Sequence, residues 1–303
     1  MIHMNVISAL VPLIILIAIG YALKQRPFFQ PEFWRGAEQL NYFVLFPLLL
    51  FLNLAFVDID FHKIQALLTV MLVLMMFAIA VLWVMQSFFK IPAQRFGVYI
   101  QSQIRFNTYI GLSVISALFG ITGMQTFAMI MLVAIPFVNM ISVWALSQGM
   151  GLTWSQMAKT VLKNPLILGC VFGLLFNVSD LNLVKPLKDS MQLLANCSLP
   201  LGLLCVGAGL KFLSFRYAFG LLLLNSIGRL IVMPVLAFML CRISGLGDQE
   251  SMILTVFFAL PTATAGYILT KILNGDSELM AGIISLQTLG FAFTFPFLMG
   301  WLF

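Results

Sequence analysis

The sequence predicts an all-α polytopic membrane protein with ten transmembrane helices in two inverted five-helix repeats. Three observations predict this fold class. Hydrophobic residues make up 62% of the 303 residues and charged residues only 9%, whereas a soluble domain carries about a quarter charged residues. The mean hydropathy is +1.07, and long apolar segments follow one another along the chain. Glycines and prolines also recur at matching positions in the two halves.

The apolar segments are long enough to cross a bilayer, which takes about 20 residues of helix. The first segment has neither a basic leader nor a small-residue cleavage site, so we expect a retained span rather than a signal peptide. Gly120 ends the fourth segment, and Asn274, Gly275 and Asp276 separate the last two. The ten predicted spans cover approximately residues 5–24, 37–56, 64–88, 97–119, 124–148, 161–179, 189–211, 217–242, 250–273 and 279–302.

An internal repeat divides the chain into residues 1–153 and 154–303. Glycine and proline shape the helix backbone, so ordered pairs of them at a nearly constant offset indicate two copies of one fold. The offset is about 153 residues in the first spans of each half and about 155 later. The matched pairs are Pro12 and Pro165, Gly20 and Gly173, Pro47 and Pro200, Gly111 and Gly266, and Gly120 and Gly275. Such repeats are common in secondary transporters.

The basic residues predict the orientation. Loops after odd-numbered spans hold ten Lys and Arg residues, and loops after even-numbered spans hold four. The positive-inside rule therefore places the odd loops in the cytoplasm and both termini outside it. Because each repeat has an odd number of spans, the second copy enters the membrane from the opposite side. We therefore expect inverted repeats, the geometry that suits alternating access.

The fourth predicted span carries a dense polar cluster around Arg105, and its repeat mate in the ninth span carries Pro261. A proline disturbs a membrane helix, and Gly111 and Gly266 allow the backbone to bend. Interrupted helices present amides and the positive dipole end to a ligand, and Arg105 adds a bidentate donor. We therefore expect an anion site where the two interrupted helices meet near the membrane midplane, a place that we call the crossing. Its predicted substrate-binding residues are Arg105, Asn107, Thr108, Tyr109, Gly111, Pro261, Thr262, Thr264 and Gly266.

Each of these residues also has a plainer interpretation. Arg105 can reach the cytoplasmic surface with its long side chain, and Pro and Gly often only shape helix packing. Arg229, in the eighth span, has no acid at its depth and can bond the carbonyl groups of an interrupted helix, a coupling or structural role. Asn41 and Asn196 are assigned the same class of role, through hydrogen bonds between helices. Tyr109 and Tyr267 are candidates for an apolar flank of the site.

Several kinds of function are disfavoured. The acids, Glu38 among them, fall in loops or at span ends, so we expect no proton or sodium coupling through a membrane carboxylate. The four cysteines have no metal-ligand spacing, so neither a metal nor another cofactor is expected. Basic residues are scattered, which disfavours a nucleic-acid partner. No catalytic motif such as H-E-x-x-H occurs, and no pore-loop motif favours an ion channel.

Short motifs in consistent order carry a resemblance to a known family. They are Leu45-Phe46-Pro47, Asn164-Pro165-Leu166-Ile167, Gly207-Ala208-Gly209-Leu210, Arg229-Leu230 followed by Pro234, Leu260-Pro261 and Asn274-Gly275-Asp276. With the ten-span plan, the whole chain resembles a bacterial member of the auxin efflux carrier family. This family includes plant PIN proteins and bacterial malate or malonate permeases. One departure is Thr108, where many family members have a proline.

The resemblance implies a fold like that of sodium/proton antiporters and bile-acid symporters. Spans 1, 2, 6 and 7 would form a scaffold, homodimeric in the bacterial inner membrane, and spans 3–5 and 8–10 a transport unit. Substrate would bind near Asn107, Thr108, Pro261 and Thr262. The function expected is secondary active or facilitative transport of organic anions, such as malonate or malate, by elevator-type alternating access. The alternatives are a larger amphipathic monocarboxylate, as in auxin, and an ion channel.

Overall fold

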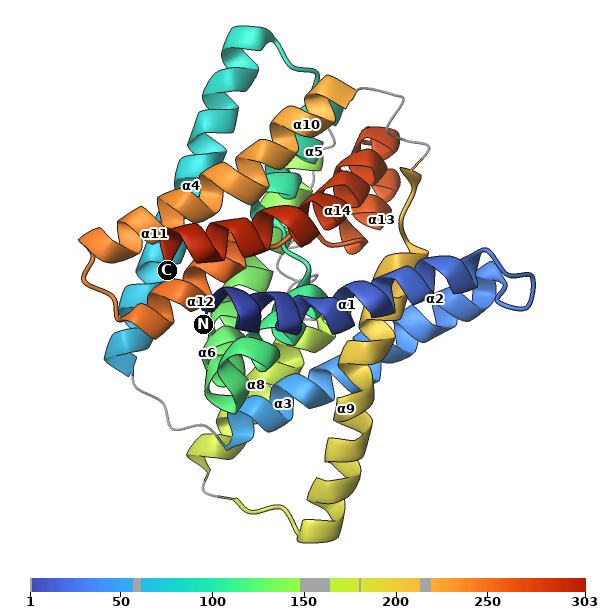
Figure 1. Ribbon diagram of the computed structural model, residues 1–303, viewed down its shortest axis with the longest axis vertical. Coiled ribbons are helices and arrows are strands. Elements are labelled where there is room, and N and C mark those ends of the chain that lie inside the picture. Colours follow the sequence, from blue (N-terminus) through green and yellow to red (C-terminus); the bar gives the residue numbers. More distant parts are fainter. Residues whose placement is uncertain (1, 57–60, 148–163, 180, 213–218) are drawn as a thin grey trace.

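The computed structural model describes residues 2–56, 61–147, 164–179, 181–212 and 219–303. Within these ranges the chain is helical and contains no strand (Figure 1). The predicted boundary between the repeats and the predicted start of the sixth span lie outside the described residues. The helices are α1 (Ile2–Lys24), α2 (Pro31–Leu40), η1 (Asn41–Leu45), α3 (Phe46–Ala55), α4 (Phe61–Phe89), α5 (Ala93–Ile104), α6 (Thr108–Leu146), α8 (Pro165–Val178), α9 (Lys185–Ala208), α10 (Phe219–Ile227), η3 (Gly228–Val232), α11 (Met233–Ile243), α12 (Asp248–Ala259), α13 (Ala265–Ile272) and α14 (Ser277–Leu302).

Seven helical stretches of the described residues are long and apolar enough to cross a membrane. The prediction of a polytopic all-α membrane protein is therefore confirmed. The remaining predicted spans take other forms. The fourth and fifth are joined in one stretch, Ala93–Leu146; the sixth is the shorter helix α8; and the ninth is divided into α12 and α13. The count of ten membrane-crossing helices stays a prediction.

The backbone leaves the helical conformation at Gly120 and Asn274, as the sequence predicted. Gly120 has φ 60° and ψ −149° and divides α6 at the predicted end of the fourth span. Asn274 has a φ of 54°, and Asp276 caps α14 by accepting a hydrogen bond from the Leu279 amide at 3.0 Å. These residues therefore perform the turn and capping roles that the sequence predicted.

Two helix pairs approach so closely that only glycine fits between them. Helix α1 packs against α9, and α3 packs against α8 (Figure 1). A Cβ atom on Gly20 of α1 would lie 2.1 Å from the Leu204 carbonyl oxygen of α9. A Cβ atom on Gly173 of α8 would lie 2.8 Å from the Phe51 carbonyl oxygen of α3. Gly20 and Gly173 are 153 residues apart in sequence, and so are Phe51 and Leu204.

Gly207 offers a direct test of the α1–α9 contact. A Cβ atom there would lie 1.9 Å from the Ile17 carbonyl oxygen, a backbone atom that cannot rotate away. We expect Gly207→Ala to destabilise the protein by about 1–3 kcal/mol, as overpacking does, measured as a lower Tm. Gly220→Ala is the matched control, because nothing lies within 4 Å of the added methyl group. Equal Tm values for the two variants would contradict this packing.

Candidate functional site

The fourth predicted span is interrupted between α5 and α6 by Arg105, Phe106 and Asn107. Arg105 and Asn107 have extended ψ angles of 139° and 103°. The Asn107 side chain then caps α6, because its Oδ1 atom accepts hydrogen bonds from the amides of Tyr109 at 3.1 Å and Ile110 at 3.2 Å. This capping bond fixes the Asn107 amide group and starts the new helix.

The prediction that the backbone bends at Gly111 is wrong. Its amide donates to the Asn107 carbonyl oxygen at 2.9 Å, inside the first turn of α6. A Cβ atom on Gly111 would lie 2.7 Å from side-chain atoms of both Leu260 and Phe127. The residue is therefore glycine because α6 packs closely against the opposite break. The backbone changes direction three to six residues earlier, at Arg105–Thr108.

The ninth predicted span is interrupted between α12 and α13 over residues 260–264. Leu260 precedes Pro261 and has the extended conformation that proline imposes on its neighbour, with a ψ of 139°. Gly266 is not the point of interruption. Its amide donates to the Ala263 carbonyl oxygen at 3.0 Å, within the first turn of α13. Pro261 therefore ends α12, as the sequence indicated, whereas Gly266 permits close packing against Met280.

The two interruptions contact each other directly. The Asn107 amide donates to the Pro261 carbonyl oxygen at 2.7 Å. The Thr262 hydroxyl donates to the Ser102 carbonyl oxygen at 2.7 Å, and the Thr262 amide donates to Gln287 Oε1 at 2.9 Å. The Pro261 carbonyl and the Thr262 hydroxyl and amide are thus engaged by other residues of the protein and are not free to bind a ligand. Pro261 and Thr262 therefore hold the two interrupted segments together.

Arg229 binds the carboxyl-terminal ends of both α5 and α12. The side chain is fully buried. Its guanidinium donates to the carbonyl oxygens of Leu260 at 2.8 Å, Gln103 at 2.6 Å and Phe257 at 3.2 Å. A helix carries partial negative charge at its carboxyl end. Arg229 therefore neutralises two such ends with one cation and satisfies carbonyl groups that have left the helical pattern.

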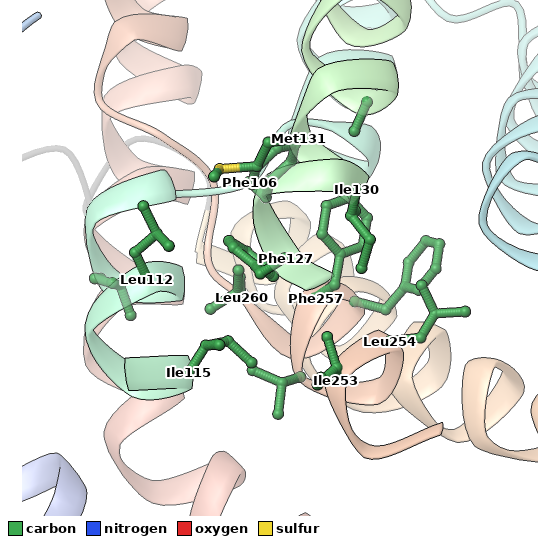
Figure 2. Packing of buried hydrophobic residues seen from close by; sticks show 14 of the residues in the cluster. Phe106, Leu112, Ile115, Phe127, Ile130, Met131, Ile253, Leu254, Phe257 and Leu260 are labelled. Carbon is green, nitrogen blue, oxygen red and sulfur yellow. The ribbon is translucent and has the colours of Figure 1, made fainter. Parts of the chain in front are cut away.

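An aromatic cluster packs the crossing. Figure 2 shows Phe106 from the first break together with Phe127 of α6 and Phe257 of α12. The ring centroids of Phe106 and Phe257 are 4.5 Å apart, and those of Phe127 and Phe257 are 6.2 Å apart. Phe127 and Phe257 are completely buried. This packing fixes the position of the short extended segment that carries Arg105 and Asn107.

A cavity of about 500 Å³ lies beside the crossing. It is lined by residues of the two breaks, of α6 and α13, and of α2, η1 and the starts of α3 and α8. Five of the predicted substrate-binding residues line it, namely Arg105, Asn107, Thr108, Tyr109 and Thr264. Its other polar and charged lining residues are Arg35, Glu38, Gln39, Tyr42, Asn139 and Asn164.

Two buried hydrogen-bond donors in the cavity wall lack partners. Among the described residues, no group accepts a hydrogen bond from Arg105 Nε or from Asn107 Nδ2. The other end of the guanidinium is held, since Arg105 Nη2 donates to Asn139 Oδ1 at 3.3 Å. A buried donor without an acceptor is costly, so it normally faces water or a ligand. The amino-terminal ends of α6 and α13 reach the same cavity and add partial positive charge.

A family model described as "Membrane transport protein" matches residues 5–159 and 150–299. The chain belongs to this family, that of the auxin efflux carriers. No curated protein matches the chain. Family membership and the apolar helices together make the protein a multi-pass membrane transporter.

The remaining predicted residues of this transporter lie outside the cavity wall. Asn41 joins α9 to η1, because its Nδ2 donates to the Ser198 carbonyl oxygen at 2.9 Å and its Oδ1 accepts from the Ser198 hydroxyl at 2.8 Å. Asn196 is exposed and accepts a hydrogen bond from Gln192 one turn earlier. The ring of Tyr267 packs beneath the Lys211 ammonium, 3.9 Å from the ring centroid.

None of the six other polar and charged lining residues was predicted from the sequence as part of the site. Asn139 lies on α6, and its Oδ1 accepts the hydrogen bond from Arg105 at the cavity. Asn164 opens the motif before α8 and caps that helix, accepting from the Leu166 amide at 2.9 Å. Glu38 and Tyr42 lie on α2 and η1, and α2 begins at Pro31, earlier than the predicted span. An earlier start for the second span would have indicated Glu38.

Proposed function

We propose that the protein is a secondary active or facilitative transporter of organic anions, with the substrate carboxylate bound at Arg105 and Asn107. The observation that carries this proposal is the pair of buried, unpartnered donors on one cavity wall, among the described residues. A carboxylate has two acceptor oxygens, which fit the Arg105 Nε–H and the Asn107 amide group. A neutral or cationic ligand would leave these donors without a strong acceptor.

The helix ends strengthen the preference for an anion. The amino-terminal ends of α6 and α13 line the cavity, whereas Arg229 binds carbonyl groups at the carboxyl-terminal ends of α5 and α12. Anions are stabilised at helix amino termini. The arrangement therefore presents the positive ends to the ligand and compensates the negative ends inside the protein.

The lining residues bear on the choice between substrate classes. Arg35 is a second cation on the cavity and can pair with the second charge of malonate or malate, which Arg105 alone leaves unpaired. We therefore place small dicarboxylates first. The second candidate is a larger amphipathic monocarboxylate, favoured by the apolar wall of Phe43, Phe46 and Ile268 and by a volume of about 500 Å³.

Elevator-type movement of a transport unit against a scaffold is supported by the composition of the cavity. The anion donors come from segments that we assign to the transport unit, whereas α2, η1 and α8 belong to the predicted scaffold. A substrate there would lie between the two units. The glycine contacts support two inverted repeats. Gly20 contacts Leu204 and Gly173 contacts Phe51, and an offset of 153 residues relates Gly20 to Gly173 and Phe51 to Leu204. We also propose that the scaffold is homodimeric, that the protein lies in the bacterial inner membrane, and that both termini lie outside the cytoplasm.

The proposal is tested by measuring the Tm of the purified transporter with a panel of mono- and dicarboxylates and their neutral amides. We expect saturable stabilisation by malonate or malate and none by the amides, because only the acids supply a charged acceptor for Arg105. At a concentration of about 100 times Kd, binding stabilises a protein by about 2.7 kcal/mol. If no carboxylate raises the Tm, the proposal fails. Anion flux into liposomes that never saturates would favour a channel instead.

A further inference from the structure

Glu38 places a carboxylate in the wall of the anion cavity. Helix α2 begins at Pro31, so Glu38 lies about two turns inside it, and it lines the same cavity as the two helix breaks. The side chain is half-buried. The sequence had placed every acid in loops or at span ends. The early start of α2 changes this conclusion for Glu38, because it brings the residue to the same cavity as Arg105.

The surroundings of Glu38 hold few groups that could compensate its charge. Helix α2 packs against η1 and α9. The titratable and charged groups that face Glu38 or share its cavity are Arg35 on its own helix, Tyr42 of η1, Cys205 of α9, Tyr109 of α6 and Arg105. Within the described ranges, neither a hydrogen bond nor an ion pair joins the Glu38 carboxylate to any of them. It is therefore an acid that can change its charge without breaking a bond.

We propose that Glu38 is a proton-binding site of the cavity, and that binding of an organic anion is linked to uptake of a proton by this carboxylate. The inference rests on the proposed function, because the linkage requires an anion at Arg105. Two like charges in one partly desolvated cavity repel each other, which disfavours ionised Glu38 once the anion is bound. A proton from solvent then adds to a carboxylate oxygen of Glu38, so the net change on loading is one anion and up to one proton.

The sign of the effect follows from this linkage. As the pH falls, more of the substrate-free protein already carries the proton on Glu38, and the anion meets less repulsion. Anion affinity should therefore rise on acidification. Loading would be favoured on the more acidic side of the membrane, so that a proton gradient biases the direction of anion uptake.

Calorimetry with malonate tests the linkage in the full-length transporter. Titrations in buffers of different ionisation enthalpy report the protons taken up on binding. We expect the wild type to take up a substantial fraction of a proton, and its Kd to fall about five- to tenfold between about pH 8 and about pH 6.5. Glu38→Gln, close in shape and neutral, should lose this proton uptake and bind malonate more tightly than the wild type at the higher pH.

Two further variants make the result specific. Glu32→Gln removes an exposed acid from the same helix, outside the cavity wall, and should behave like the wild type. Glu38→Asp keeps a titratable group and should retain proton uptake. Protonation of malonate itself contributes equally in every variant, so the difference between Glu38→Gln and Glu32→Gln isolates Glu38. If Glu38→Gln does not fold, malonate binding to the wild type without proton uptake still overturns the role of Glu38.

The outcomes separate this inference from the proposed function. Malonate binding without proton uptake, or the same pH dependence in the wild type and in Glu38→Gln, overturns the role of Glu38 and leaves the anion site standing. If malonate does not bind the wild type at either pH, both proposals fail for this substrate class. Proton uptake that is lost only in Glu38→Gln supports the linkage.

Discussion

Replacing Arg229 by methionine is expected to destabilise the transporter by about 3 kcal/mol or more and to abolish transport. Methionine fills a similar volume but leaves the carbonyl groups of Gln103, Phe257 and Leu260 without their buried donors. An unsatisfied buried polar group costs about 1–3 kcal/mol, and three are left here. The substitution also removes the cation that compensates the partial negative charge at the carboxyl-terminal ends of α5 and α12. The Tm of the purified variant measures the loss.

Two controls distinguish the role of Arg229 from a general need for arginine. Arg242 is exposed and pairs with Asp248 at 2.7 Å. Arg242→Met should change stability by about 1 kcal/mol at most, since surface ion pairs contribute little. Arg229→Lys keeps the charge but not the fork that reaches three carbonyl groups, so it should fall between the wild type and Arg229→Met. A Tm of Arg229→Met equal to that of the wild type would contradict the role assigned to this side chain.

The gross fold could be predicted because each membrane helix has to be apolar over its own length. Pro261 indicated one interruption correctly, since a proline constrains its own backbone and that of the preceding residue. Gly120 and Asn274 likewise revealed positions where φ is positive. Helix hydrophobicity and the backbone preferences of proline, glycine and asparagine are local properties, so they can be predicted from the sequence alone.

The exact cavity wall could not be predicted in the same way. Gly111 and Gly266 looked like hinges, yet they are small because Leu260 and Phe127 come close to Gly111 and Met280 comes close to Gly266. Thr262 looked like a ligand, but its hydroxyl bonds Ser102. In each case the role of the residue depends on a contact with a residue from another part of the chain. Glycine and threonine have the same sequence signal whether they pack helices or face a ligand.

Arg105 is the residue through which the anion site can be tested most directly. We expect Arg105→Ala to weaken carboxylate binding at least about tenfold, or about 1.4 kcal/mol. The side chain supplies an unpartnered Nε–H within the described cavity wall, and its one hydrogen bond to the protein goes to Asn139. Its loss should therefore leave the fold largely intact. Malonate and a monocarboxylate of similar size are titrated into the wild type and the variant by calorimetry, with Tm as the measure of folding.

A comparison with Arg35 distinguishes the two carboxylates of a dicarboxylic substrate. If Arg105 holds the carboxylate that all substrates share, Arg105→Ala should weaken monocarboxylate and malonate binding by similar factors. If Arg35 pairs with the second charge, Arg35→Ala should weaken malonate binding alone. Equal losses for both ligands in Arg35→Ala would point to general attraction of anions into the cavity. Unchanged affinity in folded Arg105→Ala would return Arg105 to a purely structural bond with Asn139, and the donors at the helix breaks would need another ligand.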